Sequence, residues 1–383
     1  MKNKLYTAIG LMSGTSMDGV DASLIRSNGI DEFTNILDKY YEYDDSLHQE
    51  LIDLRNLILV DEDLRKYSNR LSELEREITI FHSKVVNEIS LKYNDEIDFI
   101  GFHGQTIFHN PEKKITKQLG EGNLLSQLVN KRVIYDFRQK DLKNNGQGAP
   151  LTPIFHHLLS QNINKKYKIE FPVCFINIGG ISNITKISKK NEILEENLEA
   201  FDSGPGNCLI DEWIRKKTNK RFDKNGSIGK SGKVNQLILN QAIENFNIIS
   251  YNKSLDVKNY DVSFARGLSL EDGCATITNF TAFLISEGIK FSRKNNENIS
   301  NKYLICGGGR KNNFLINCIN DYLKNFSNII LESVDLYNYK GDYIESQAFG
   351  YLAIRSYLSL PITFPKTTGC KAPTTGGFIV KNF

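Results

Sequence analysis

Long apolar runs are absent from this sequence of 383 residues. No stretch approaches the ~18 consecutive apolar residues that a membrane-spanning helix needs. The first residues lead directly into a strand-like segment, without the apolar core of a secretory signal peptide. We therefore expect no membrane partner and no export.

Paired cysteines are missing as well. The six cysteines are scattered, without a CxxC pair and without the His/Cys spacing of a zinc site. Several lie in apolar runs, where a thiol behaves as a small hydrophobic side chain. Their positions are Cys174, Cys208, Cys274, Cys306, Cys318 and Cys370. This pattern argues against a structural zinc site and favours a reducing cytoplasm.

A strong charge of one sign is the third absence. The net charge of +3 comes from 48 basic and 45 acidic side chains spread along the whole chain. Short basic patches such as Lys165, Lys166 and Lys168 are typical of a solvated surface, and no arginine-rich arm or aromatic stripe accompanies them. Nucleic acid is therefore not an expected partner.

The length predicts two lobes, because a single hydrophobic core rarely grows to this size. Each half opens with a strand, a polar glycine turn and a second strand, over residues 5–27 and again over residues 173–188. These repeated hairpins indicate a duplicated α/β unit. We predict an N-terminal α/β lobe over 1–168 and a C-terminal α/β lobe over 169–383, with a helix near 343–358 that could pack back on the first lobe.

Other elements follow from periodicity and turn residues. A helical region is expected over 46–92, interrupted near 60–63, and a buried strand over 97–102 that ends at the string HGQT. Helices are also expected over 208–217 and 314–326. The segment 148–164 should form a connecting helix, with Pro150 and Pro153 in its first turn.

The first hairpin turn, residues 13–19, contains two glycines, three hydroxyl side chains and one carboxylate. Such a turn presents backbone N–H groups and hydroxyls to one point, which suits phosphate oxygens. Asp18 and Asp21 could hold a hydrated Mg²⁺ that bridges those phosphates. A plain surface hairpin is the alternative for this turn taken alone.

The string GSIGKSGK over 226–233 has the look of a phosphate-binding P-loop, but Lys224 stands where that motif requires its first glycine. It also follows a polar loop instead of a strand. We reject a P-loop here.

Asp202 is the strongest candidate for a catalytic carboxylate. It ends an apolar run and is followed by the glycine-rich residues 203–207, which allow a close approach to a ligand. The alternative role is an N-terminal cap of the helix 208–217, for which Asn207 is better placed.

Two polar segments could contact a polyhydroxylated ligand. The string GFHGQTIFH places His103, Gln105 and Thr106 at the end of the predicted strand, although a lone histidine is more often a core or loop residue. In the following loop, Arg138 could bind a carboxylate with both guanidinium nitrogens. A salt bridge from Arg138 to Asp136 or Asp141 is an equally good interpretation.

Two further segments carry weaker signals. The string GGGRKNN over 307–313 ends a strand and opens a helix, a geometry that suits nucleotide contacts. Glu345 starts a helix, where an acidic residue complements the helix dipole without any catalytic role. The tail TTGCKAPTTGG reads as a polar loop.

Together these segments resemble the anhydro-N-acetylmuramic acid kinase family. The shared strings are GLMSGTSMDGVD, GFHGQT, DFRQKDL, GQGAPLTPIFH, NIGGISNI, FDSGPGN, GGGRKN and ESQAFGYLA. They follow the family's order over nearly the whole chain, and the first and the FDSGPGN string are highly specific. The chain departs from the family at Ser203, where threonine is common, and at Ser346 and Gln347, which replace smaller or apolar residues.

The resemblance implies the actin/hexokinase superfamily fold, with two ribonuclease-H-like α/β lobes and an interdomain active-site cleft. It implies ATP and Mg²⁺ as cofactors, an amino sugar as substrate, and a homodimer that serves peptidoglycan recycling. It implies Asp202 as catalytic base with Glu345 as a second acidic residue. The implied nucleotide-binding residues are Gly14, Thr15, Ser16, Met17, Asp18, Gly19, Val20, Asp21, Gly179, Gly180, Gly204, Gly307, Gly308, Arg310 and Asn312. The implied substrate-binding residues are His103, Gln105, Thr106, Arg138, Asp141, Gln147 and Asn177.

Two rival functions remain open from the sequence. An ordinary hexose or N-acetylhexosamine kinase would also need a base, which Asp202 could supply. An ATP-switched module like actin would instead show slow hydrolysis that sugars do not affect.

Overall fold

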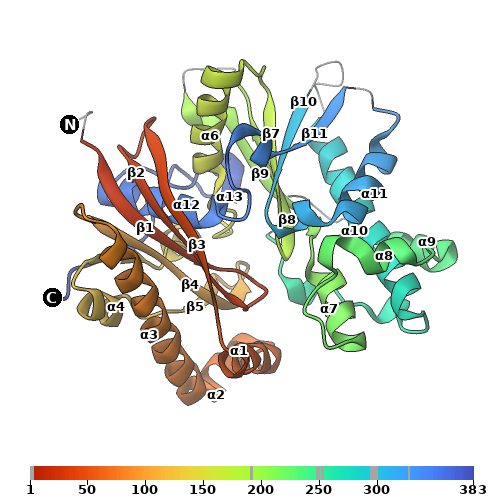
Figure 1. The fold of residues 1–383 in the computed structure, drawn as a ribbon, viewed down its shortest axis with the longest axis horizontal. Helices are drawn as coiled ribbons and strands as arrows, with labels where there is room; N and C mark the ends of the chain where they lie inside the picture. The colour runs from red at the N-terminus through yellow and green to blue at the C-terminus, as the bar shows by residue number, and fades with distance from the viewer. Residues whose placement is uncertain (1–3, 190–192, 247–250, 252–253, 294–300, 327) are drawn as a thin grey trace. The chain divides into compact units, whose positions relative to one another are not determined.

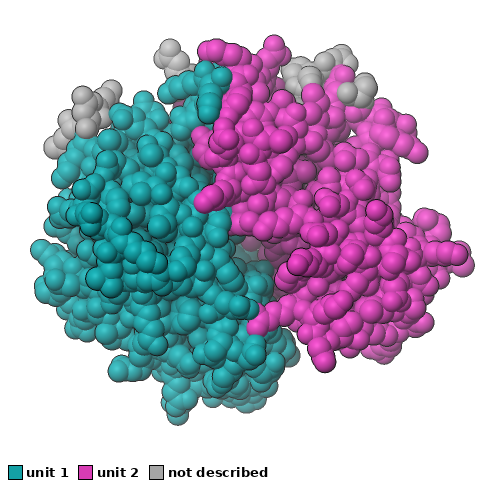
Figure 2. Space-filling view, viewed as in Figure 1, with its two compact units in different colours: residues 1–166, 343–383 teal, residues 167–342 magenta. Residues whose placement is uncertain are grey.

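The computed structural model describes residues 4–189, 193–246, 251, 254–293, 301–326 and 328–383. Internal contacts divide the chain into two compact units (Figures 1 and 2). Unit 1 comprises Met1–Lys166 and Tyr343–Phe383, and unit 2 comprises Tyr167–Asp342. No helix in the described part of the chain is long and apolar enough to cross a membrane.

Unit 1 is built on a seven-stranded sheet in the order β12-β6-β4-β1-β2-β3, with β5 paired to β4. β1 and β2 form the predicted N-terminal hairpin, and β1 runs parallel to β4. The strands are β1 Tyr6–Ser13, β2 Gly19–Ser27, β3 Phe33–Glu42, β4 Phe99–Asn110, β5 Ile115–Leu119, β6 Arg132–Tyr135 and β12 Phe378–Val380.

Helices cover both faces of this sheet (Figure 1). Ile9 and Leu11 of β1 share a core with Ile78 of α3 on one face. On the other face, Gly10 packs so closely on α12 that a Cβ there would lie 1.9 Å from the carbonyl oxygen of Ser346. The helices are α1 Asp45–Leu57, α2 Asp61–Lys66, α3 Ser68–Lys92, α4 Gly122–Val129, α5 Gln139–Lys143, α6 Pro153–Tyr167, α12 Ile344–Tyr357 and α13 Pro365–Thr368.

Unit 2 repeats the same strand plan in a five-stranded sheet of order β11-β10-β7-β8-β9. An antiparallel hairpin, β7 and β8, again lies beside parallel strands on one side and an antiparallel edge strand on the other. The strands are β7 Val173–Ile178, β8 Ile181–Ile187, β9 Leu198–Pro205, β10 Asn301–Cys306 and β11 Ile329–Ser333. The α-helices are α7 Cys208–Lys217, α8 Ser227–Ser231, α9 Gln236–Asn245, α10 Leu270–Ser292 and α11 Asn313–Leu323. The predicted two-lobed α/β architecture is confirmed.

The structure corrects three local predictions. The strand expected over 97–102 continues to Asn110, because β5 pairs with its second half. β9 likewise continues to Pro205, so Asp202 lies inside a strand and does not end it. Pro150 precedes α6, whose first residue is Pro153.

The C-terminal segment belongs to unit 1 by its contacts. α12 packs on β1, β2 and β4, and Tyr351 of α12 lies against Phe155 of α6 with ring centroids 5.6 Å apart. The contacts therefore divide the chain after Lys166 and again after Asp342, whereas the predicted second lobe ran from 169 to 383.

Candidate active site

The turn between β1 and β2, residues 14–18, is held by bonds to its carbonyl oxygens. Gly14 O accepts from the backbone N–H of Met17 at 3.2 Å and from Gln105 Nε2 at 2.9 Å. Thr15 O accepts from Arg55 Nη1 at 2.8 Å, and Asp18 O accepts from the backbone N–H of Tyr43 at 2.9 Å. Because protein donors bind these acceptors, three carbonyl groups of the turn are already satisfied.

Met17 gives this turn a buried anchor. Its backbone φ is +59°, a left-handed conformation that is uncommon outside glycine, and its side chain is fully buried in the unit 1 core. Nearby, Ser16 Oγ donates to Asp18 Oδ1 at 2.5 Å. The turn thus has a fixed conformation and is anchored in the core by Met17.

Three of the predicted nucleotide-binding glycines are not required by packing. A Cβ at Gly14, Gly179 or Gly308 would meet nothing closer than 3.6 Å, and none of the three has a positive φ. In contrast, a Cβ at Gly19 would lie 2.4 Å from the carbonyl oxygen of Tyr41. The absence of a side chain at Gly14, Gly179 and Gly308 therefore leaves space that the fold itself does not fill. A ligand that approaches the backbone closely needs such space.

A bulge in β4 positions the predicted sugar-binding string. Leu11 pairs with Phe102 and Ser13 pairs with Gln105, so β4 carries one extra residue at this point, where Gly104 has φ +74°. Gln105 is fully buried, and no donor among the described residues bonds its Oε1. Thr106, one residue on, accepts from Gln118 Nε2 at 3.3 Å.

His103 and Arg138 are brought together, as the sequence did not predict. Arg138 Nη2 donates to His103 Nε2 at 2.9 Å, and Arg138 Nη1 donates to Gly148 O at 2.7 Å. His103 Nδ1 must carry the proton, because it donates to Gly104 O at 2.8 Å. Burial and the neighbouring Arg138 charge hold the pKa of His103 well below its usual range.

Asp141 and Gln147 hold the loop before α6 to the C-terminal segment. The Asp141 carboxylate accepts from the backbone N–H of Gly148 and from Thr368 Oγ1, each at 2.7 Å. The backbone N–H of Gln147 donates to Thr368 O at 2.7 Å. These bonds give Asp141 a structural task, and its contact with substrate stays a prediction.

In unit 2, Asp202 lies on the edge strand β9 beside a bulge. Asn183 pairs with Asp202 and Ser182 with Gly204, which leaves Ser203 as the extra residue. Bulges re-aim side chains and are common next to active sites. Asp202 is 7% exposed, and its Oδ2 accepts from the backbone N–H of Leu255 at 2.8 Å and from Ser254 Oγ at 3.3 Å.

The second glycine turn, after β7, is bonded to the start of α7. The backbone N–H of Gly206 donates to Gly180 O at 2.8 Å, and that of Asn207 donates to Gly179 O at 2.7 Å. Asn207 occupies the N-cap position of α7, as predicted, but its side chain makes no capping bond. Asn177, at the end of β7, is buried, and Cys306 Sγ lies 3.8 Å from its Oδ1.

The segment after β10 is fixed by Arg310. Its guanidinium donates to Asp342 through Nη1 and Nη2 at 2.7 and 3.0 Å, and to Asp335 through Nε at 2.6 Å. Although burial acts in the opposite direction, these carboxylates raise the pKa of Arg310. Asn312 caps α11 by accepting from the backbone N–H of Leu315 at 3.0 Å. Both side chains stabilise the segment, and nucleotide contact by them stays a prediction.

The rejected P-loop string has a structural explanation. The Asp223 carboxylate accepts from the backbone N–H groups of Ile228 and Gly229 at 2.9 and 3.0 Å. A protein carboxylate therefore takes the donors that a phosphate would need in a P-loop.

Asp18 and Asp21 are the two carboxylates predicted to hold Mg²⁺. Asp21 lies two residues before Ser23 on the same face of β2, and Ser23 Oγ lies 2.7 Å from the Oγ of Ser346, the neighbour of Glu345. Among the described residues no group of three or more His, Cys, Asp or Glu side chains could hold a metal ion. Binding of Mg²⁺ by Asp18 and Asp21 stays a prediction.

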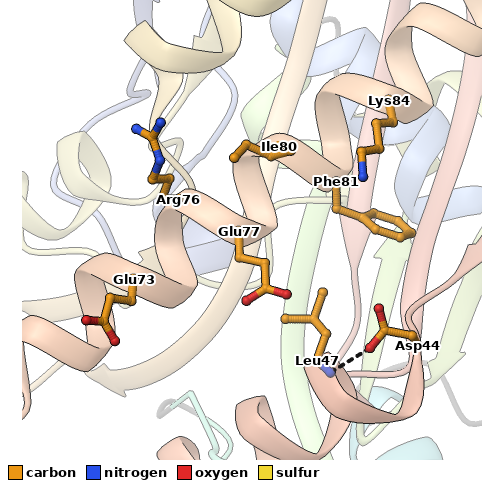
Figure 3. A pocket seen from close by; sticks show the side chains of 8 residues that line it. All are labelled: Asp44, Leu47, Glu73, Arg76, Glu77, Ile80, Phe81 and Lys84. Atoms are coloured by element: carbon orange, nitrogen blue, oxygen red, sulfur yellow. Dashed lines mark hydrogen bonds between the residues drawn. The ribbon is translucent and has the colours of Figure 1, made fainter.

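A small pocket of about 220 Å³ lies between α1 and α3, apart from the predicted site residues (Figure 3). Asp44, Glu77 and Lys84 line it together with Leu47 and Phe81, so charges of both signs occur in its lining. Asp44 uses its carboxylate to cap α1 through the backbone N–H of Leu47 at 2.9 Å. None of the residues predicted to bind nucleotide or sugar lines this pocket.

The sequence did not predict the partners of these site residues. Leu255 is 53 positions from Asp202, and no local signal links them. His82 is different, because it follows Ile78 by four residues and precedes Ile89 by seven on the apolar stripe of α3, a spacing that indicates burial.

Comparison with known proteins gives a full-length match. The family model described as "Anhydro-N-acetylmuramic acid kinase" matches residues 6–382. A protein of that name from Pelagibacter ubique is 52% identical over 382 residues, covering 99% of this chain and 100% of the relative. Another of that name, from Agrobacterium fabrum, is 36% identical over 385 residues and 99% of each chain.

Solved structures give a more distant likeness. The activator of the 2-hydroxyisocaproyl-CoA dehydratase from Clostridium difficile, with bound ADPNP, covers 92% of this chain and 96% of its own, with 11% identity and a TM-score of 0.41. A ROK family glucokinase from Streptomyces griseus, in complex with glucose and AMPPNP, covers 91% of this chain and 99% of its own, with 9% identity and a TM-score of 0.38.

Proposed function

Because the chain belongs to the anhydro-N-acetylmuramic acid kinase family, we propose that Asp202 and the turn 14–18 carry out the reaction that the family name describes. The enzyme is an ATP-dependent kinase that opens 1,6-anhydro-N-acetylmuramic acid and phosphorylates it, giving N-acetylmuramic acid 6-phosphate and ADP. The observation that supports this assignment is the family match over residues 6–382, together with 52% identity to a relative over its full length.

The substrate explains why a base is needed. Its internal ether joins C1 to O6, so the 6-position has no free hydroxyl group to phosphorylate. A water oxygen attacks C1 while Asp202 accepts a proton from that water. The C1–O6 bond breaks, and O6 forms a bond to the γ-phosphorus as the bond from that phosphorus to the bridging oxygen of ADP breaks. A positioned base contributes about 10²- to 10⁴-fold to such a step.

The bond from Leu255 supports this role for Asp202. A backbone N–H that binds Oδ2 at 2.8 Å fixes the rotation of the carboxylate about its Cβ–Cγ bond. A base that is already oriented does not lose that freedom when the substrate binds. Ser254 Oγ, 3.3 Å from the same oxygen, adds a second restraint.

In unit 1, the turn 14–18 binds the ATP phosphates in this proposal. Three of its carbonyl oxygens are bound by Gln105, Arg55 and Tyr43, so these three are not left to repel an anion. Mg²⁺, held through water by Asp18 and Asp21, would neutralise charge on the phosphates. Glu345 is the second acidic residue in this scheme, and Arg138 and His103 bind the sugar.

A peptidoglycan-recycling role, a cytoplasmic location and a homodimer follow from the family in this proposal. Light scattering of the purified protein measures the dimer directly. The alternative of an ordinary hexose kinase is not favoured by the relatives, which carry the name of the anhydro sugar kinase.

One experiment tests the reaction. The protein is incubated with ATP, Mg²⁺ and the anhydro sugar in ¹⁸O-water, and the product is analysed by mass spectrometry. We expect one ¹⁸O at the anomeric carbon of a 6-phosphate. Phosphate transfer to N-acetylglucosamine or glucose but not to the anhydro sugar would favour the rival kinase instead.

A further inference from the structure

A buried polar cluster lies at the base of the turn 14–18. It consists of Ser13 at the end of β1, Tyr43 just after β3, and His82 of α3. Ser13 Oγ lies 2.9 Å from the hydroxyl of Tyr43 and 3.2 Å from His82 Nε2. Each of the three side chains is at most 1% exposed. Hydrogen bonds in such surroundings are strong, and an unmade bond is costly.

The proton positions in this cluster follow by elimination. His82 Nδ1 lies 2.7 Å from Ile78 O, which can only accept, so Nδ1 carries the proton. Burial lowers the pKa of His82 to about 4, so the ring is neutral and Nε2 is an acceptor. Ser13 therefore donates to His82 Nε2. Burial also raises the pKa of Tyr43, whose hydroxyl keeps its proton and donates to Ser13 Oγ.

Tyr43 is bonded to both ends of the turn. Its side-chain hydroxyl binds Ser13, the residue before the turn, and its backbone N–H binds Asp18 O, the last residue of the turn, at 2.9 Å. The Tyr43 ring is held in place by Phe81, with centroids 4.8 Å apart. One residue outside the hairpin thus fixes the separation of the two ends.

We propose that Tyr43, with Ser13 and His82, is a positioning residue that holds the turn 14–18 in its nucleotide-binding shape. The inference rests on the proposed role of this turn in binding the ATP phosphates. If the cluster is broken, the turn samples other shapes, and only the fraction in the binding shape takes up ATP. The apparent affinity for ATP then falls, and that for the sugar falls less, because the turn acts on the predicted sugar-binding residues through the bond from Gln105 Nε2 to Gly14 O.

The test uses Tyr43→Phe in the full-length enzyme, because this change removes the hydroxyl and keeps the ring. Losing one hydrogen bond corresponds to about two- to tenfold in an equilibrium constant, so we expect KM and Kd for ATP to rise by that factor. KM for the anhydro sugar should change less than twofold. Tyr93→Phe is the matched control, because its hydroxyl accepts from Arg26 at the other end of the β1–β2 hairpin. That control should leave both constants unchanged.

Two further variants separate positioning from general destabilisation. His82→Gln keeps an acceptor near Ser13 and should retain more ATP affinity than His82→Leu, which has none. Ser13→Ala removes the shared hydroxyl with the smallest change in volume, and it replaces Tyr43→Phe should that variant fold poorly. Equal ATP constants in the wild type, Tyr43→Phe and Ser13→Ala would overturn the proposal. An equal loss of affinity for ATP and for sugar would overturn it too.

Gly14→Ala distinguishes this inference from the proposed function. Space for the added methyl group exists in the protein, so a loss of ATP affinity would report contact between the turn and the phosphates. If Gly14→Ala leaves ATP binding intact, the turn is not the phosphate site and the proposed function is wrong at that point. If Gly14→Ala weakens ATP binding but Tyr43→Phe does not, only the positioning role is wrong.

Discussion

The backbone N–H of Leu255 donates a hydrogen bond to Oδ2 of Asp202 across 2.8 Å, although 53 residues separate the two in the chain. Asp202 lies on the edge strand of its sheet, next to the bulge at Ser203. A segment from outside the sheet therefore orients this carboxylate, and the bulge sets the direction in which it leaves the strand.

This contact makes Asp202→Asn a clean test of the base. The amide oxygen of Asn can still accept from Leu255, so the local structure should survive, while the group no longer accepts a proton. We expect kcat to fall at least about 10²-fold, with Kd for ATP and for the anhydro sugar within about threefold of wild type. Single-turnover kinetics and calorimetry provide these values.

Glu199→Gln serves as the control for that variant. Glu199 lies three residues earlier on β9, so the same loss of a carboxylate is introduced on the same strand. Its turnover should match that of the wild type. Near-normal turnover by Asp202→Asn would remove Asp202 from its proposed role.

The glycines that packing does not require should act on ligand binding alone. We expect Gly179→Ala and Gly308→Ala to leave the free energy of unfolding nearly unchanged, because each added methyl group has room. Both changes should weaken ATP binding, since a side chain would then occupy space left for the nucleotide. Calorimetric titration with ATP and urea unfolding measure the two effects separately.

Variants at two other glycines serve as controls for this experiment. Gly267→Ala adds a methyl group where no atom lies within 4 Å and should alter neither quantity. Gly206→Ala places a Cβ 2.2 Å from the carbonyl oxygen of Gly179 and should lower stability markedly. If the Gly179 and Gly308 variants bind ATP as wild type does, the space beside these glycines is not used by the nucleotide.

Asp38 should be important for the stability of unit 1. Its Oδ1 accepts from Ser23 Oγ at 2.7 Å and from Gln347 Nε2 at 3.0 Å, and both donors are buried. Asp38→Ala leaves these donors without that acceptor, so we expect the free energy of unfolding to drop by about 1–3 kcal/mol. Urea unfolding measures the drop.

The double variant Asp38→Ala with Gln347→Leu completes this test. Replacing donor and acceptor together removes the unmet bond, so the loss in the double variant should be smaller than the sum of the two single losses. Strict additivity would show that the two side chains do not interact. The same pair bears on the proposed site, because Gln347 and Ser346 follow Glu345 on α12.

Local patterns predicted much of the fold. Both glycine-turned hairpins, the interrupted helical region before β4 and the bounds of α7 follow from alternation, spacing and turn residues. β4 and β9 run past their predicted ends, because a neighbouring strand satisfies their backbone groups beyond the apolar run. Pairing with a neighbouring strand therefore determines where β4 and β9 end, and no sequence pattern within either strand predicts that pairing.

Part of the candidate site could also be predicted from local sequence patterns, and part could not. The turn 14–18, Gln105 and Asp202 were predicted from residue types that suit phosphate, sugar and proton transfer. Their supports, Tyr43 and Leu255, were not, because each acts through a bond to a residue at least 25 positions away or through its backbone N–H group. A backbone donor has no signature in the sequence.

The histidines should make stability depend on pH below neutrality. Three of the six, His82, His103 and His156, are buried, and His109 and His157 are partly buried. Burial lowers the pKa of His82 and His157 to about 4 and of His109 and His156 to about 3, with that of His103 well below its usual range. In the unfolded chain a histidine titrates near 6.5. Between about pH 6.5 and 4 the unfolded chain therefore binds protons that the folded chain does not, so stability falls as the pH falls. Each of these five histidines adds up to about 1.4 kcal/mol per pH unit, and above pH 7 none contributes.

Urea unfolding at half-unit steps from pH 8 to pH 5 measures this slope, in a window above the ordinary pKa range of carboxylates. His109→Gln removes one of these five imidazoles and should reduce the slope between pH 6 and pH 5 by about 1 kcal/mol per unit, while leaving the slope above pH 7 unchanged. His109 suits this purpose because its Nδ1 contact with Thr116 at 3.0 Å can be replaced by an amide. A free energy of unfolding that stays constant from pH 7 to pH 5 would show that these imidazoles take up protons as readily in the folded protein as in the unfolded chain, contrary to the lowered pKa values that burial gives them.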